Sequence, residues 1–173
     1  MERLNLGRTI ILSNEILGTA QVVAANVKNV LNIGFNTHDT NLDHICKSVI
    51  SEVERITETT LITEREVSVI WQSFFDDEIL PYCPIKAETN VMVKDLEGVD
   101  YPVADYQLVN NGGIYRLVGD FPDGVKVTYT TSKLTITEIQ KLAIARIAAE
   151  VFSNPTADIG MLVLKNARIF RFY

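Results

Sequence analysis

The spacing of apolar residues changes twice along this chain, and no other feature of the sequence limits the fold as strongly. Between positions 39 and 57 apolar residues recur every three or four positions, as on one face of an α-helix. From position 61 to 130 they alternate with polar residues, as in half-buried strands. The helical spacing returns at position 135. The sequence therefore predicts an α+β fold, with helices before and after a β section.

A pair of helices is predicted before the β section. The clearer one runs from Asp39 to Thr57, and either Asp39 or Thr40 can cap its start by accepting free backbone N–H groups. A shorter helix is expected within residues 20–31, followed by the glycine-containing stretch NIGFNTHDT. The domain is thus predicted to open with two helices joined by a short loop.

The β section is predicted to be an antiparallel meander. The sequence Asn-Asn-Gly-Gly at positions 110–113 lies between YQLV and IYRLV, and such residues tolerate the positive φ angles of tight hairpin turns. Residues 106–118 are therefore expected to form a β-hairpin. A second turn is expected at 121–124, and alternating segments at 90–94 and 125–130 supply further strands.

One long helix is predicted after the sheet. Thr135 and Glu138 have the spacing of a capping box, and Asn154 with Pro155 ends the helix. Its many alanines allow close packing on more than one side. This composition predicts either the central helix of the domain or a helix packed against another subunit, and we expect the chain to self-associate.

The remaining segment, residues 156–173, is predicted to be an extended tail that docks on another chain. It follows a helix stop and has no later element to pack against, yet it is rich in apolar residues, which disordered tails usually lack. An alternative is that the tail folds back and completes a sheet of its own chain, since a terminal strand often covers a sheet edge. The candidate docking residues are Met161, Leu162, Leu164, Lys165, Arg168, Ile169, Phe170, Arg171, Phe172 and Tyr173.

Charge and hydropathy exclude several classes of protein. The net charge of -6 argues against a protein whose main task is to bind phosphates, which requires clustered Lys and Arg. The start of the chain does not resemble a signal peptide, and no apolar run approaches the roughly 18 residues of a membrane span. We therefore expect synthesis in the cytoplasm and no membrane partner.

No catalytic, cofactor or metal site is predicted. Cys46 and Cys83 are far apart and belong to no CxxC pair, so two buried thiols are expected. Trp71 is expected in a core or an interface. Two groups of residues could in principle bind a metal ion: His38, Asp39, Asp43 and His44, and the cluster Asp76, Asp77 and Glu78. Neither has a standard ligand spacing, so we interpret them as helix-capping residues and as solvated loop residues.

Several segments of the sequence together resemble the head-tail connector (adaptor) family of tailed bacteriophages. VKNVLNI and DTNLDHICKSVISEVERITETTL look like the opening helices of that family, the hairpin with GVKVTYTT like its sheet, and LTITEIQKLAIARIAAEVFSNP like its final helix. The resemblance covers roughly residues 20–155. The chain departs from the family in the residues TTSK at 130–133, which replace the usual turn, and in residues 1–18, which are additional.

The resemblance implies a virion structural protein without enzymatic activity or cofactor. Proteins of this family form a ring, often dodecameric, beneath the capsid portal, provide a DNA conduit and carry the next connector or tail protein. DNA would pass through the ring without sequence-specific binding. Together with the composition of the tail, the resemblance predicts three domains: an N-terminal extension (1–18), an adaptor domain (19–155) and a docking arm (156–173). The alternatives are a head-closure or tail-completion ring protein and, from another class, a small metal-dependent hydrolase or nuclease.

Overall fold

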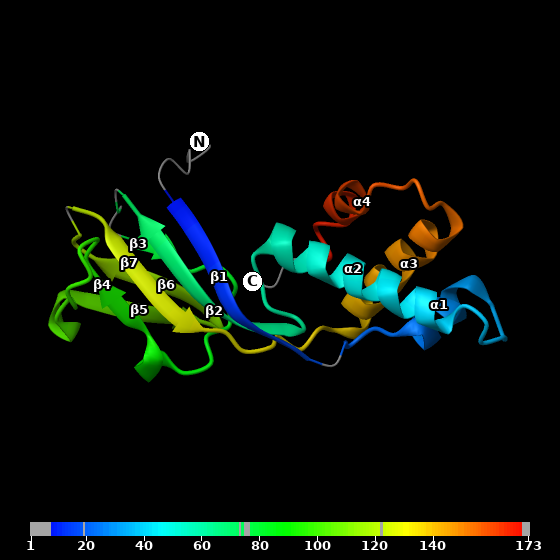
Figure 1. The fold of residues 1–173 in the computed structure, drawn as a ribbon, viewed down its shortest axis with the longest axis horizontal. Helices are drawn as coiled ribbons and strands as arrows, with labels where there is room; N and C mark the ends of the chain where they lie inside the picture. Colours follow the sequence, from blue (N-terminus) through cyan, green and yellow to red (C-terminus); the bar gives the residue numbers. More distant parts are fainter. Residues whose placement is uncertain (1–7, 19, 73, 75–76, 122, 171–173) are drawn as a thin grey trace. The chain divides into compact units, whose positions relative to one another are not determined.

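The computed structural model of the chain describes residues 8–18, 20–72, 74, 77–121 and 123–170. It divides into two compact units, each built from separate stretches of sequence (Figure 1). The β unit comprises residues 1–17 and 63–133, and the helical unit comprises residues 18–62 and 134–173. The predicted α+β class is confirmed. This division differs from the sequence-based boundaries, because segments distant in sequence complete each unit.

The described strands of the β unit form two antiparallel sheets. The first has the order β1-β2-β7-β4, with β1 at Arg8–Leu17, β2 at Thr63–Trp71, β7 at Val125–Thr130 and β4 at Met92–Lys94. The second has the order β3-β6-β5, with β3 at Asp77–Ile79, β6 at Ile114–Gly119 and β5 at Tyr106–Asn111. The expected simple meander is wrong, because β7 pairs with β2 and β4 rather than with β6. Alternation fixes which face of a strand is buried, but not which strand lies beside it.

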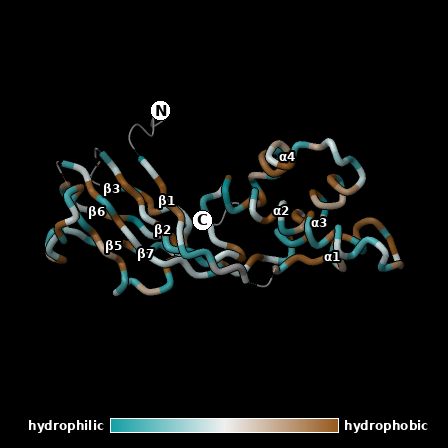
Figure 2. Tube along the Cα trace, in the orientation of Figure 1, coloured by the Kyte–Doolittle hydropathy of each residue, from teal (hydrophilic) through white to brown (hydrophobic). Residues whose placement is uncertain are grey.

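The core of the β unit is formed by alternate residues of its strands. In β2 every second residue is buried, including Val67, Val69 and Trp71, as the alternating pattern predicted. Figure 2 shows the corresponding hydrophobic positions along the strands. The same cluster contains Leu117 of β6 and Phe121, so residues of both sheets contribute to one core.

The predicted hairpin is confirmed between β5 and β6. Gly112 and Gly113 have φ angles of 66° and 97°, and Asn110 Oδ1 accepts the N–H of Gly113 at 2.8 Å. The second predicted turn brings the backbone of Gly124 (φ 88°) against Trp71, where a Cβ atom would lie 2.5 Å from the carbonyl oxygen. Only glycine can close this turn without displacing β2.

Strand β1 occupies most of the segment for which the sequence indicated no element. It pairs with β2 from Arg8 opposite Trp71 to Leu17 opposite Thr63, with a register shift between Ser13 and Ile16. Residues 8–17 are therefore an edge strand of the first sheet. Their partner, β2, lies far along the sequence, so no local turn sequence predicts the pairing.

The helical unit contains, in its described part, α1 (Ala24–Leu31), α2 (Asp39–Thr57), α3 (Glu138–Ser153) and α4 (Ile159–Lys165). The bounds of α2 agree with the prediction. Helix α3 contacts each of the other three, as α2 also does. Its alanines at 143, 145, 148 and 149 are buried and allow these close approaches (Figure 1).

The predicted helix caps differ in detail. Thr137 and Gln140, rather than Thr135 and Glu138, form the capping box of α3: Gln140 donates its N–H to Thr137 Oγ1 at 3.3 Å, and Thr137 donates its N–H to Gln140 Oε1 at 2.8 Å. Asp39 does not cap α2 and instead pairs with Lys28 at 3.0 Å. Both threonines have a suitable partner three residues later, so the sequence alone could not choose between them.

Two side chains satisfy the backbone where the chain enters and leaves the helical unit. Glu54 is 1% exposed, and its Oε1 accepts the N–H groups of Leu61 at 2.6 Å and Ile62 at 2.7 Å. The Gln21 amide donates to the carbonyl oxygens of Leu61 (3.2 Å) and Leu134 (2.8 Å) and accepts the N–H of Ile136 at 3.1 Å. These two residues thus join segments distant in sequence.

Replacing Glu54 with alanine should destabilise the helical unit strongly. The variant leaves two buried N–H groups without this acceptor, which costs about 3 kcal/mol of unfolding free energy. Glu54→Gln retains an oxygen acceptor and should lose less. Urea denaturation followed by circular dichroism measures both variants. The exposed Glu150→Ala is the matched control, and equal stability of Glu54→Ala and Glu150→Ala would contradict this role.

Candidate docking surfaces

The C-terminal segment forms a helix rather than the expected extended tail. Asn154 and Pro155 end α3 as predicted, but Asp158 then caps α4 by accepting the N–H of Met161 at 3.0 Å. The signal for this helix was available in the sequence as an Asp followed by the apolar run IGMLVLK. It was missed because the stop signal suggested that no further element would follow.

One side of this segment belongs to the core of the helical unit. Val163 is fully buried, and Leu162 and Phe170 are 6% and 2% exposed within the same hydrophobic cluster as α1, α2 and α3. Ile169 packs against that cluster, and its carbonyl oxygen accepts a bond from the Gln140 side chain at 3.3 Å. Three of the predicted docking residues, Leu162, Ile169 and Phe170, are therefore occupied in their own chain. Up to residue 170, where its described part ends, the segment folds back onto the helices and contains no strand.

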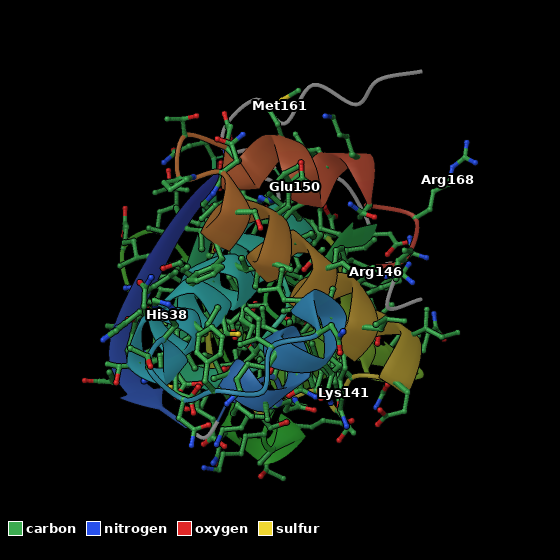
Figure 3. All side chains as sticks on the ribbon, turned by 90° about the vertical axis from the view of Figure 1, so that its right-hand side faces the viewer. His38, Lys141, Arg146, Glu150, Met161 and Arg168 are labelled. Atoms are coloured by element: carbon green, nitrogen blue, oxygen red, sulfur yellow. The ribbon has the colours of Figure 1, made fainter. Side chains whose placement is uncertain are left out.

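The other side of the segment is exposed. Met161 and Leu164 are 53% and 54% exposed, and Lys165 and Arg168 are also exposed. The spacing of three and four positions from Met161 places Leu164 and Lys165 along one side of α4, and Arg168 lies in the turns that follow the helix. Figure 3 shows Met161 and Arg168 extending away from the ribbon. We call these four residues the α4 face. The predicted docking residues Arg171, Phe172 and Tyr173 lie outside the described residues.

A second exposed apolar surface follows α3. Ile139 and Leu142 are 71% and 45% exposed, and Arg146 and Glu150 continue the same side of the helix. Figure 3 shows Arg146 and Glu150 in succession along α3. We call these four residues the α3 stripe. Because the alanines on the remaining sides are buried, the stripe is the part of α3 that is open to another chain.

A third surface lies on loops of the β unit. Leu96, Val99 and Val103 are 42%, 63% and 78% exposed in the connection from β4 to β5. The loop is fixed by Asp95, whose Oδ1 accepts the N–H of Val99 at 2.8 Å. Tyr101 anchors it on Phe121, with ring centroids 4.9 Å apart.

Acidic residues surround these exposed apolar side chains. Burial raises the pKa of Tyr101, and the nearby carboxylates of Asp95, Asp123 and Asp120 raise it further because they disfavour a phenolate. We call the surface of Leu96, Val99 and Val103 with the acids of these loops the tip. Its acids are Asp95, Glu97, Asp100, Asp105, Asp120 and Asp123.

Charge is divided unevenly between the two units. The whole net charge of -6 belongs to the sequence of the β unit, whereas acidic and basic residues balance in the helical unit. Among the described residues, the ion pair found at the tip joins Lys94 to Asp100 at 3.3 Å. The tip therefore combines apolar contact area with a marked excess of negative charge.

The histidine grouping considered as a metal site has other partners. The ring of His38 packs edge-on against Phe35 and Phe152, at centroid distances of 5.8 and 5.4 Å. Asp43 accepts the N–H of Ala24 at 2.6 Å, and His44 is exposed. Within the described ranges, no three His, Cys, Asp or Glu side chains are grouped to hold a metal ion.

The acidic cluster, Trp71 and the two cysteines are the other residues singled out from the sequence. Asp77 pairs with Arg116, and Asp76 lies outside the described residues. Trp71 is 3% exposed and packs in the core of the β unit. Both cysteines are buried free thiols, as predicted, and burial raises the pKa of Cys46 to about 12 and that of Cys83 to about 11. Such thiols hold little reactive thiolate at neutral pH.

None of the helices in the described part of the chain has the length and apolar character needed to cross a membrane.

Comparison with known proteins finds likeness in structure and not in sequence. No protein-family model matches the chain, and no curated protein matches it. A chain in the neck of an empty gene transfer agent (GTA) particle, computed with C6 symmetry, is 18% identical with a TM-score of 0.58, covering 87% of this chain and 93% of that one. A chain in the virion of the native GTA particle is 20% identical with a TM-score of 0.56, covering 88% and 94%.

A third similar chain comes from the neck of the native GTA particle, computed with C12 symmetry. It is 19% identical with a TM-score of 0.50, covering 87% of this chain and 93% of that one. At this level of identity the likeness shows a shared fold. Its coverage extends over sequence from both the β unit and the helical unit.

The two sides of the C-terminal segment should respond differently to truncation of a side chain. Phe170→Ala removes a buried ring and should lower the unfolding free energy by about 3 to 5 kcal/mol. Leu164→Ala acts at an exposed position and should change it by about 0.5 kcal/mol or less. Thermal and urea denaturation measure both. A Phe170→Ala variant as stable as the parent chain would show that the segment is separable from the core.

Proposed function

We propose that this chain is a structural protein of the neck of a tailed phage or phage-like particle, where it forms the head-to-tail adaptor ring. The observation that carries the proposal is the fold shared, over nearly the whole chain, with chains from GTA necks and virions. The connector-like order of helices and hairpin in the sequence supports the same assignment. The proposed location is the head-tail junction of the particle.

In this proposal the chain assembles into a cyclic ring of identical subunits, dodecameric in the simplest case. Two of the similar chains belong to necks computed with C6 and C12 symmetry, which supports a cyclic arrangement. The ring docks on the portal, extends the DNA channel and provides a platform for the next connector or tail protein. Its task is mechanical, with no catalytic step and no cofactor.

The α4 face is the proposed portal-docking surface. Met161 and Leu164 provide exposed apolar area, and Lys165 and Arg168 provide charges that orient a partner more than they add affinity. Leu162 and Phe170 hold this face in position from the core beneath it. The proposed docking role of the segment is thereby assigned to its exposed residues, together with Arg171, Phe172 and Tyr173 at the end of the chain.

Portal binding should depend on the α4 face. The double variant Leu164→Asp and Arg168→Glu places negative charge on it and should weaken binding to the cognate portal at least about tenfold, without lowering the melting temperature. Surface plasmon resonance on immobilised portal measures the affinity. Lys47→Glu, a charge reversal at an exposed position of α2, is the matched control and should bind as the parent chain does.

Binding and activity assays distinguish the adaptor from its alternatives. Unchanged portal binding by the double variant would remove the docking role of the α4 face. A parent chain that binds another ring of the neck, but not the portal, would identify a head-closure or tail-completion protein. Turnover of an ester or phosphodiester that requires a divalent ion would favour the hydrolase instead.

Duplex DNA should bind weakly. A subunit with a net charge of -6 repels the phosphate backbone, which suits a channel through which DNA slides without sequence-specific contacts. Fluorescence anisotropy with a labelled duplex at physiological salt should give no binding tighter than the roughly micromolar nonspecific range. A nanomolar dissociation constant would contradict the proposed conduit.

A further inference from the structure

We infer that the tip of one copy docks on the α3 stripe of the neighbouring copy and that this contact is the repeating interface of the ring. The inference deepens the proposed function, since it names the surfaces by which the subunits join. It concerns contacts between copies and uses neither the α4 face nor the portal.

A ring imposes a condition on its subunits that a two-fold dimer does not. Each copy must present two different surfaces, one for each neighbour, because a head-to-tail interface closes into a ring only when the two are complementary. The tip belongs to the β unit and the α3 stripe to the helical unit, so they are separate surfaces of one chain.

Both surfaces contain apolar side chains that are largely exposed. Among the large hydrophobic residues whose side chains the structure describes, Val103 and Ile139 have the largest exposed fractions, at 78% and 71%, and one lies on each surface. Val99 at 63% adds to the tip, and Leu142 at 45% adds to the stripe. Burying these four side chains against each other removes apolar area from water, which favours association.

Charge favours pairing the tip with the helical unit of a neighbour. Two tips brought together would oppose surfaces of the same sign, which costs free energy. The helical unit is neutral in sequence, and the α3 stripe carries the exposed Arg146 in its middle and Glu150 one turn further on, so it has no net negative charge to repel the tip. Among the described residues no ion pair to Arg146 is found, so its guanidinium is open to the carboxylates of a neighbouring tip.

Contacts within the chain support the described residues of the tip. Tyr101 and Phe74 pack edge-on against Phe121, with centroids 4.9 and 4.8 Å away, and Asp95 closes the turn that displays Val99. A preorganised loop loses little conformational freedom on binding. This order distinguishes a docking surface from a flexible acidic loop.

Disulfide trapping between two variants that each carry one introduced cysteine tests the contact directly. Val103→Cys and Leu142→Cys are prepared separately and mixed under mild oxidation, so that a disulfide between the two positions must join different copies. The native Cys46 and Cys83 are buried and should remain reduced. We expect a covalent heterodimer in the mixture, in at least about fivefold greater yield than from either variant alone or from Val103→Cys mixed with Lys47→Cys. Equal yields in all mixtures would overturn the inference.

A charge-reversal pair supplies an independent readout. Arg146→Glu should reduce the trapped yield roughly tenfold, and Glu97→Lys in the partner copy should restore it, since the two reversals together recreate an opposite-charge pair. Loss with Arg168→Glu but not with Arg146→Glu would move the interface to the α4 face and overturn the assignment to α3. A positive result here combined with no portal binding by the parent chain would keep this interface and reject the adaptor function.

Discussion

The fold depends on satisfying buried backbone groups where the chain passes between its two units. The chain crosses between them near positions 17, 62 and 133. Beside these crossings Gly18 donates its N–H to the carbonyl oxygen of Ile62 at 2.8 Å, and Leu134 donates its N–H to that of Thr60 at 2.7 Å. Glu54 and Gln21 add side-chain hydrogen bonds to the backbone of residues 61, 62, 134 and 136. Because an unpaired buried N–H is costly, these two side chains help to fix the end of the first helical segment and the start of the second.

The sequence predicts elements with local signals and fails where the deciding contact is distant. Helix α2 and the hairpin at Gly112 were predicted because periodicity and turn residues lie within the element itself. Strand β1 was missed because its partner β2 lies far along the chain, and a short apolar segment without turn residues fits several structures. The pairing of β7 with β2 was missed for the same reason.

The predicted docking residues show what amino-acid composition can and cannot predict about burial. The segment from 156 to 173 is rich in apolar residues, and the sequence could not tell burial in its own chain from burial in another. In the structure Val163 and Phe170 lie in the core, while Met161 and Leu164 are exposed. The sequence suggested that the long helix after the sheet could pack against another subunit, but it did not indicate which of its residues are exposed. The tip was not predicted as a surface, because exposure depends on how the loops pack.

Three exposed surfaces and an uneven distribution of charge are consistent with a subunit that contacts several neighbours at once. The most direct test of the neck assignment is a cryo-electron microscopy reconstruction of particles that carry this chain. We predict a ring of density between the portal and the tail, into each subunit of which the β unit and the helical unit can be fitted individually. Density for this chain in the tail tube or baseplate, or its absence from assembled particles, would contradict the assignment.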